Sequence, residues 1–357
     1  MHYELFIIFA PKKKNNVMKI KFNQRTYLYV AAIGFACIIL QLGYYMLTSV
    51  TAKGDTQYVY IDKDDTQDSV IVKLSAVSRR QALWGLGMLM RHTDYADHIH
   101  TGRYALNGNV VQVFHRLKRG QQTSLNLTIP EVRTMDMLAG YLGRRLMMDS
   151  TTIAQSLCDS IVCSQWGYDT CTISALFVPN TYNVYWDMSL DELLKRMQRE
   201  NENFWKGTRQ EKADKMGMTP VEVCTLASII DEETSNTAEK PMIAGMYLNR
   251  LKADMPLQAD PTIKFALKQF ELRRIYNKLL TTDSPYNTYK NTGLPPGPIK
   301  IASIKGIDAV LNHVRHDYLY MCAKEDFSGT HNFARTYQEH LKNAARYTAA
   351  LNARGIQ

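Results

Sequence analysis

The strongest pattern in the chain is an uninterrupted apolar stretch near its beginning. Residues 27–47 read YLYVAAIGFACIILQLGYYML, and Gln41 is the only strongly polar side chain among these 21 residues. That length suffices to span the hydrocarbon core of a bilayer, whereas the apolar core of a signal peptide usually has only about 7–15 residues. The stretch therefore predicts an uncleaved transmembrane helix. A small-residue cleavage site at Val50-Thr51-Ala52 is the alternative.

Charge on either side of this stretch predicts its orientation. Residues 1–26 carry six basic side chains and one acidic one, Glu4, so their net charge is 6 − 1 = +5. On the other side the aspartates prevail: Asp55, Asp62, Asp64, Asp65 and Asp68. Because basic flanks stay inside, we expect a cytoplasmic N-terminus at 1–26. The chain would cross the cytoplasmic (inner) membrane once, with its body outside.

The remaining charge argues against a nucleic-acid partner. The whole chain has 43 Lys and Arg and 34 Asp and Glu, a net charge of +9. Subtracting the +5 of residues 1–26 leaves +4 for the rest, and no long basic run occurs there. A protein that binds nucleic acid needs a basic patch or stripe on its surface. We therefore expect no nucleic acid to bind to this protein.

Hydrophobic periodicity divides the body into further parts. Residues 48–68 are polar and acidic, which predicts a linker. Residues 69–122 predict a small α+β module, with strands at 70–72 and 102–106 and helices at 78–91 and 110–118. Residues 123–218 predict a connecting part with a strand at 125–129 and helices at 134–145, 151–158 and 189–204.

A sharp helix start follows at residue 219. Thr219-Pro220-Val221-Glu222 combines an N-cap threonine, proline at the first helical position and glutamate three residues after the cap. The predicted helix runs to about Thr234. On a helical wheel its apolar arc includes Leu226, Ile229 and Ile230, and Glu233 falls inside that arc. Asp231 lies at the border of the arc, and Glu232 points away.

The position of Glu233 suggests acid–base chemistry. A carboxylate on an apolar helix face loses hydration, which raises its pKa toward the range that a general acid needs. Glu233 is therefore our catalytic candidate. The alternative is that the frayed helix end lets Glu233 turn to solvent or pair with Arg250.

Asp260 has two interpretations. It follows a predicted helix at 238–251 and precedes Pro261 at the start of another helix. Asp followed by Pro is first of all an N-cap followed by the first helical residue, and we favour this interpretation because it accounts for both residues. The alternative is the second carboxylate of a glycosidase pair. Turn-rich, aromatic segments at 284–289 and 293–298 suit a sugar-binding groove or any rigid surface loop.

Other chemistries find no support. The chain has no GxSxG elbow, no phosphate-binding glycine loop and no HExxH helix. Its C-terminal histidines, at 313, 316, 331 and 340, have no Cys or carboxylate at ligand spacing, so no metal and no cofactor are expected. A local disulfide among Cys158, Cys163 and Cys171 stays open.

Together these motifs resemble a known family. The run LASIIDEET…IAGMYLNRLKADMPLQADPT at 226–262, followed by SPYNTYKNTGLPPGPI, is similar to the YceG-like family of endolytic murein transglycosylases. The likeness extends to a LysM-like subdomain (GRYALNGNVVQVFHRLKRGQ), to Pro179-Asn180-Thr181-Tyr182 and to a closing segment at 318–333. It covers about residues 69–345. The implied fold is α+β: a transmembrane helix, the LysM-like module at 69–122 and a larger domain with its catalytic core at 219–345, before a tail at 346–357.

The resemblance also assigns residues. The family motif around its acid is E-x-E-T, and its second Glu falls on Glu233. Asp231 replaces the first Glu, which puts a supporting contact in doubt rather than the chemistry. Eight residues become candidate substrate contacts: Asp231, Asn249, Arg250, Gln258, Asp260, Tyr286, Asn287 and Tyr289.

The implied activity is endolytic cleavage of the MurNAc-β-1,4-GlcNAc bond in nascent peptidoglycan, which leaves 1,6-anhydro-MurNAc ends. The implied partners are glycan strands and the cytoplasmic membrane, with peptidoglycan synthases as further candidates. Two alternatives stay open. One is a muramidase that uses Asp260 as its second carboxylate, and the other is a non-catalytic glycan-binding scaffold of the wall-synthesis machinery.

Overall fold

The computed structural model describes residues 23–52, 56–272 and 275–355. The chain divides into two compact units, residues 1–123 and 124–357. Most of the basic flank expected to be cytoplasmic lies outside the described residues.

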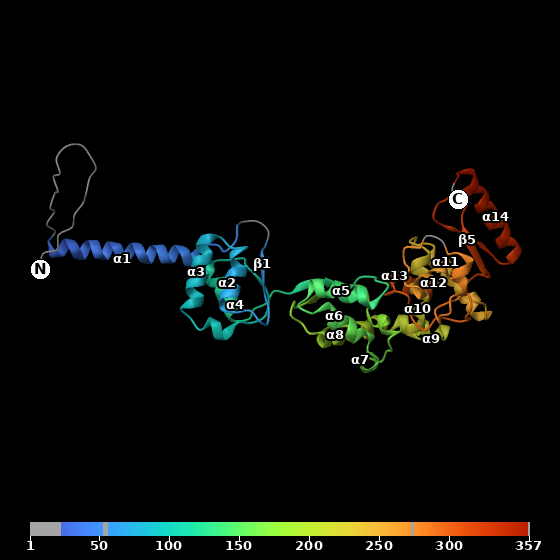
Figure 1. The fold of residues 1–357 in the computed structure, drawn as a ribbon, viewed down its shortest axis with the longest axis horizontal. Helices are drawn as coiled ribbons and strands as arrows, with labels where there is room; N and C mark the ends of the chain where they lie inside the picture. Colours follow the sequence, from blue (N-terminus) through green and yellow to red (C-terminus); the bar gives the residue numbers. More distant parts are fainter. Residues whose placement is uncertain (1–22, 53–55, 273–274, 356–357) are drawn as a thin grey trace. The chain divides into compact units, whose positions relative to one another are not determined.

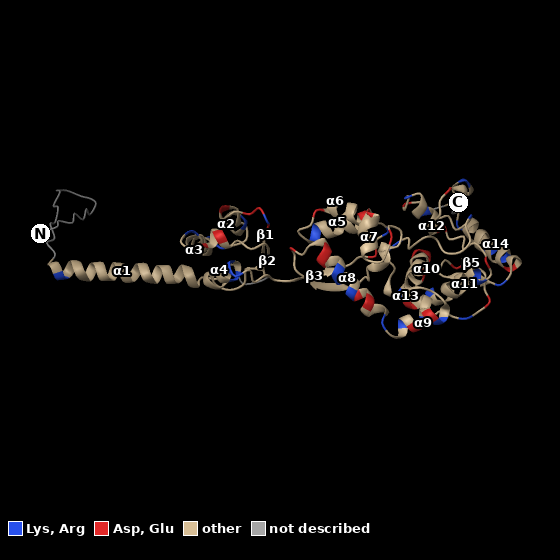
Figure 2. Cartoon of the chain, turned by 90° about the horizontal axis from the view of Figure 1, so that it is seen from below, with Lys and Arg blue, Asp and Glu red and all other residues tan. Residues whose placement is uncertain are grey.

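Helix α1 (Gln24–Leu47) coincides with the predicted apolar segment. No acidic or basic side chain follows Arg25 in this helix, and Figure 2 shows α1 in tan from its blue beginning to its end. It is long and apolar enough to cross a membrane, and none of its residues is buried in the protein. The predicted helix is confirmed, while its insertion in a membrane stays a prediction.

The expected linker at 48–68 is wrong. Val50 is fully buried, and its N–H donates to the Gly108 carbonyl at 3.0 Å. Strand β1 (Tyr58–Ile61) then pairs antiparallel with β2 (Gly102–Ala105), with Tyr58 opposite Ala105. The polar composition hid a short strand because its pairing partner lies more than forty residues away in the sequence.

The strand expected at 70–72 is also wrong, since these residues belong to helix α2 (Gln67–Ser75). A capping box between Thr66 and Ser69 starts this helix, and Val70 and Leu74, four residues apart, face the core. Three β-branched residues in a row favoured a strand locally, but burial of one helix face prevails. Helices α3 (Arg80–Arg91) and α4 (Val110–Lys118) confirm the prediction and, with the short η1 (Tyr95–His98), complete this unit.

The second unit begins with a group of helices, green in Figure 1, and a small two-stranded sheet. Strand β3 (Leu125–Thr128) pairs antiparallel with β4 (Thr181–Val184). Around them are α5 (Met135–Arg145), α6 (Ser150–Cys158), α7 (Ser160–Gln165), η2 (Ile173–Leu176) and α8 (Leu190–Trp205). Their inward side chains form one hydrophobic cluster. All six cysteines of the chain are unpaired, so no local disulfide forms.

A second cluster in the same unit surrounds α10 (Pro220–Glu233), whose predicted capping box at Thr219 is present. Figure 1 shows α9 (Thr208–Met216), α11 (Lys240–Lys252), α12 (Asp260–Ala266) and α13 (Ile304–Leu311) gathered near it. The short η3 (Asn277–Thr281) follows α12. A hairpin of β5 (Tyr320–Ala323) and β6 (His331–Ala334) leads into α14 (Tyr337–Ala353).

Helix α14 corrects the expected C-terminal tail at 346–357. It continues to Ala353, because a capping box at Thr336 and Glu339 starts it and no helix breaker interrupts it. The fold is thus a mixture of helices and two-stranded sheets. The division of the second unit at residue 219 and the LysM-like character of the module stay predictions.

Candidate active site

Three successive carboxylates end helix α10, and each has a different environment. Asp231 forms a buried ion pair with Lys240 on α11. It also accepts hydrogen bonds from the Ser303 N–H at 2.7 Å and from the Ser303 Oγ at 2.8 Å. Ser303 is the N-cap of α13. The shorter Asp231 therefore holds three helices together and makes the supporting contact that was in doubt, and it does not line the cavity that Glu233 lines.

Glu232 points to the other side of α10. Its Oε2 accepts hydrogen bonds from Arg133 Nε at 3.0 Å and from Arg133 Nη2 at 2.8 Å. Lys300 lies 3.6 Å from its other oxygen. These contacts agree with the helical wheel, which turned Glu232 away from the arc of Glu233.

Glu233 lines a cavity of about 230 Å³ between α10, α11, α12 and the β5–β6 hairpin. Its Oε1 accepts a hydrogen bond from the Tyr247 hydroxyl of α11 at 2.9 Å. The alternative in which Glu233 pairs with Arg250 is wrong, because the Arg250 guanidinium donates to backbone carbonyls. The alternative in which Glu233 turns away from the protein is also wrong, because its carboxylate lines the cavity and is held by Tyr247. The inward direction expected from periodicity is confirmed.

The surroundings of Glu233 favour its protonated form. Desolvation by burial raises its pKa from 4.5 to about 7. The Tyr247 hydrogen bond opposes this rise, the negative charge of Asp260 adds to it, and the positive charges of His331 and Lys264 oppose it. Burial prevails, so the carboxyl is poised to exchange a proton near neutral pH.

Asp260 lies in the same cavity, and the N-cap interpretation of this residue is wrong. Ala259 precedes α12 as its cap residue, and no side chain caps the helix. The Asp260 carboxylate instead accepts a hydrogen bond from the Tyr289 hydroxyl at 2.6 Å. Burial raises the Tyr289 pKa, so its phenol stays protonated and can donate. Asp260 is thus hydrogen-bonded to Tyr289, 29 residues away, and not to the helix N-terminus that the local sequence indicated.

Two more candidates, Arg250 and Gln258, line the cavity. Buried Arg250 donates to the carbonyls of Leu319 at 2.6 Å and Leu257 at 2.8 Å, and to Gln258 Oε1 at 3.3 Å. Gln258 has a positive φ of 50°, which turns the chain between α11 and α12. Arg250 therefore organises the wall of the cavity and brings a positive charge close to it.

The remaining candidates do not line the cavity. Asn249 donates to the carbonyls of His316 at 2.6 Å and Tyr318 at 3.0 Å. Asn287 is fully buried, holds its own loop together and accepts the N–H of Tyr289 at 3.0 Å. The ring of Tyr286 packs 4.7 Å from the ring of Phe265. These residues shape the walls, and Asn287 in particular positions Tyr289.

Sequence reasoning missed Tyr247 and His331 as residues of the site. Tyr247 lies within residues 226–262, which resemble the family, but its position in the helix pattern indicated only one more apolar residue facing the core. His331, at the start of β6, lines the cavity, and its Nδ1 lies 2.9 Å from Glu239 Oε2. The closing segment of the resemblance contained it, which was the available signal. Among the described residues, no group of three His, Cys, Asp or Glu side chains could hold a metal ion.

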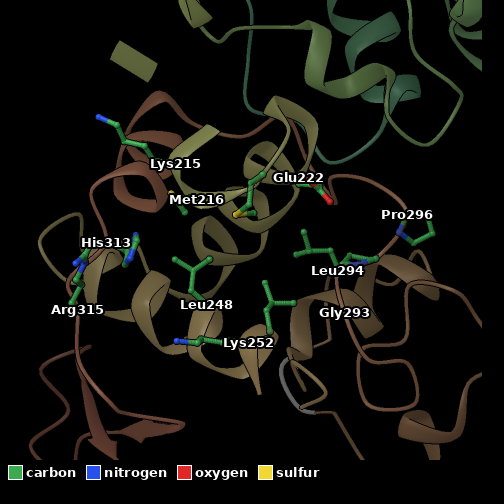
Figure 3. A pocket seen from close by; sticks show the side chains of 13 residues that line it. Lys215, Met216, Glu222, Leu248, Lys252, Gly293, Leu294, Pro296, His313 and Arg315 are labelled. Atoms are coloured by element: carbon green, nitrogen blue, oxygen red, sulfur yellow. The ribbon is translucent and has the colours of Figure 1, made fainter. Parts of the chain in front are cut away.

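A second, larger cavity of about 800 Å³ lies on another side of α11 (Figure 3). Leu248, Leu294 and two methionines contribute apolar surface, and His313 and Arg315 lie together on one side. Glu222 is the one acid among its described lining residues. That carboxylate is engaged by the Thr219 N–H at 2.7 Å and the Thr219 Oγ1 at 3.0 Å. Acid–base chemistry therefore favours the smaller cavity.

A proton-exchanging carboxyl beside a second carboxylate, in a polar cavity, is typical of enzymes that cleave glycosidic bonds. The chain belongs to the YceG-like family, whose model matches residues 59–346. An endolytic murein transglycosylase of Bacillus subtilis is 40% identical over 166 residues, which are 46% of this chain and 45% of that protein.

Two further proteins are similar over a longer part of the chain. An endolytic murein transglycosylase of Streptococcus pneumoniae (strain R6) is 29% identical over 249 residues, 62% of this chain and 44% of that protein. This chain thus spans less than half of both relatives. A crystal structure of a protein described as YceG-like, from Listeria monocytogenes, superposes with a TM-score of 0.53 at 25% identity, covering 81% of this chain and 99% of that one.

Proposed function

We propose that this protein is an endolytic murein transglycosylase that cleaves the MurNAc-β-1,4-GlcNAc bond within nascent peptidoglycan strands. Membership of the YceG-like family and the activity for which its relatives are named support the proposal. The observation that carries it is Glu233, an acid with a pKa of about 7 that lines a polar cavity. Such cleavage would limit the length of growing strands.

One carboxyl suffices for this reaction. Protonated Glu233 donates its proton to the glycosidic oxygen while positive charge develops at the anomeric carbon of MurNAc. The same group, now a base, accepts the proton of the MurNAc 6-hydroxyl as that oxygen attacks the anomeric carbon. The products are a 1,6-anhydro-MurNAc end and a free GlcNAc 4-hydroxyl. The proton is returned to Glu233, and no water is consumed.

Substrate contacts are assigned accordingly. Arg250, Gln258, Asp260 and Tyr289, which line the cavity or hydrogen-bond there, are the proposed contacts. Asp231, Asn249, Tyr286 and Asn287 position the elements that carry them.

A muramidase is the second candidate, because Asp260 lines the same cavity as Glu233. In that reaction Asp260 would activate water or act as nucleophile, and the product would be a reducing MurNAc end. A non-catalytic scaffold is disfavoured, because binding alone gives no use for an acid whose pKa is raised to about 7.

The products of digestion distinguish these functions. The full chain in detergent is incubated with purified, uncrosslinked glycan strands, and the products are separated by chromatography and mass spectrometry. We expect anhydro-MurNAc ends from inside the strands. Reducing MurNAc ends would establish the muramidase, and intact strands, in the presence of bound protein, would establish the scaffold.

Helix α1 is the proposed single-pass anchor in the cytoplasmic membrane, with the N-terminus inside and the chain after Leu47 outside. Its length and apolar composition support this assignment. A reporter that is active only outside the cytoplasm, fused after residue 52, should be active. Recovery of a soluble form beginning near Lys53 would instead identify a cleaved signal.

A further inference from the structure

Helix α1 is attached directly to the small module by side-chain and backbone contacts. The ring of Tyr45, in the last turn of α1, lies 4.6 Å from the ring of Trp84 on α3, and Met46 packs against the module's core. Beyond the helix, the Arg79 N–H donates to the Val50 carbonyl at 2.8 Å. Figure 1 shows α3 next to the end of α1. Whatever surrounds the end of α1 therefore also meets α3.

Helix α3 has an outer face of unusual composition. Arg80, Trp84, Met88 and Arg91 follow one another at intervals of four, four and three residues, so they share one side of the helix. The opposite side, with Ala82, Leu86 and Met90, is buried in the core. Trp84 is 50% exposed despite its size. Among the described residues, neither the Arg80 nor the Arg91 side chain has a hydrogen-bonding or ionic partner.

The length of α1 determines what this face meets. Its 24 residues extend about 36 Å, at 1.5 Å per residue, whereas the hydrocarbon core is about 30 Å thick. The last turn, with Tyr44 and Tyr45, therefore reaches the headgroup layer, where tyrosine and tryptophan concentrate in membrane proteins. Trp84 touches Tyr45 and lies at the same depth.

We propose that the outer face of α3, defined as Arg80, Trp84, Met88 and Arg91, lies in the headgroup layer of the outer leaflet of the membrane that α1 crosses. Trp84 and Met88 insert among the glycerol and upper acyl groups, and the two guanidinium groups bind lipid phosphates. Arginine suits that role because its planar fork binds phosphate oxygens in pairs. This inference rests on the proposal that α1 is a membrane anchor. If it holds, the small module itself is bound to the membrane surface.

Tryptophan fluorescence tests the depth of Trp84. The full chain is reconstituted in vesicles of phosphatidylcholine and phosphatidylglycerol, with bromine placed either near the headgroup or near the acyl terminus. We expect lipids with shallow bromine to quench emission more than lipids with deep bromine. This shallow quenching should disappear in Trp84→Phe and return in Trp84→Phe/Met88→Trp, which moves the indole one turn along the same face. Trp166→Phe, in the second unit, should leave the quenching unchanged.

A second probe separates this inference from the anchor itself. In Phe35→Trp, the new indole lies in the middle of α1 and should be quenched by deep bromine. If that quenching occurs while the Trp84 signal is open to aqueous acrylamide and not to bromolipid, the surface on α3 is wrong and the anchor stands. If neither indole is quenched by bromolipid, the anchor is wrong.

The arginines make a separate contribution. Arg80→Gln/Arg91→Gln should lose the part of the Trp84 quenching that depends on phosphatidylglycerol, and added salt should remove the same part from the unchanged protein. Arg119→Gln, another exposed arginine of the same unit, should have no effect. Equal quenching in neutral and anionic vesicles for the unchanged protein would overturn the role of the two arginines.

Discussion

The two cavities beside α11 differ in what lines them more than in size. The larger cavity offers apolar surface and a cluster of cations, and its one acidic lining residue is held by the N-cap of α10. The smaller cavity contains Glu233 and Asp260, each with a tyrosine hydroxyl as hydrogen-bond donor. Met246, Tyr247 and Arg250 of α11 line one cavity, and Leu248, Leu251 and Lys252 line the other.

This difference shows that volume is a poor guide to chemistry here. A general acid needs partial burial, a partner that orients it and a pKa near the working pH. Only the smaller cavity offers these three features together among the residues described. If the chemistry takes place in the smaller cavity alone, substitutions there should reduce cleavage and substitutions at the larger cavity should not.

The largest effect is expected from Glu233→Gln. The amide keeps the size and polarity of the side chain but has no proton to transfer, so cleavage should fall by about 10²–10⁴-fold. Glu222→Gln, at the larger cavity, is the matched control, because glutamine also completes a capping box. The yield of anhydro-muropeptides from both variants checks this, and near-normal yield from Glu233→Gln would move the chemistry elsewhere.

At alkaline pH, Glu233→Gln should be more stable than the unchanged protein. Because the pKa of Glu233 is raised in the folded state, its protonated form stabilises the fold fully below pH 4.5, and this contribution is lost as pH rises toward 7. Above pH 7 the unchanged protein must bury a charge that Gln lacks. Urea denaturation at pH 8 should therefore find Glu233→Gln more stable by about 1–3 kcal/mol. At pH 4 the two proteins should be alike.

Tyr247→Phe should reduce cleavage by about tenfold, the equivalent of one hydrogen bond. The Tyr247 hydroxyl lowers the Glu233 pKa, so its removal raises that pKa. The alkaline fall in kcat/KM should then move to higher pH, which a pH profile from 5 to 9 would reveal. A shift to lower pH would contradict the electrostatics of the site.

Asp260→Asn should reduce cleavage less than Tyr247→Phe does, and it should shift the alkaline limb of the pH profile in the opposite direction. The amide still accepts the Tyr289 hydrogen bond but carries no charge, so the Glu233 pKa falls and the alkaline limb moves to lower pH. Cleavage should drop by only about threefold if Asp260 binds substrate, and by at least about 10²-fold if it is a second catalytic carboxylate. The size of the loss thus separates the transglycosylase from the muramidase.

The smallest effects should come from the larger cavity. Lys252→Ala and Arg315→Ala remove exposed cations that have no described partner, so stability should change by less than about 0.5 kcal/mol. Cleavage of uncrosslinked glycan should be unchanged. A loss as large as that of Tyr247→Phe would show that the substrate extends into both cavities.

Local patterns predicted a large part of this molecule. The apolar helix at 27–47 and the helix from Thr219 were found because their signals are contained within the segments themselves: composition in one, an N-cap and periodicity in the other. The inward direction of Glu233 followed from the same periodicity. The resemblance to the YceG-like family is likewise a property of residue order.

Long-range contacts decided the rest. Val50 and residues 58–61 belong to the module because they pair with Gly108 and with β2, respectively. The three residues at 70–72 are helical because one side of α2 is buried. Asp260 accepts a hydrogen bond from Tyr289 instead of capping its helix. Tyr247 donates a hydrogen bond to Glu233, although the sequence around Tyr247 shows only an apolar position of a helix. Sequence alone determined that α1 and α10 are helices and which way Glu233 faces. Only the tertiary structure decided which side chains meet, because such pairs join residues that are distant in the chain and depend on the packing of several elements at once.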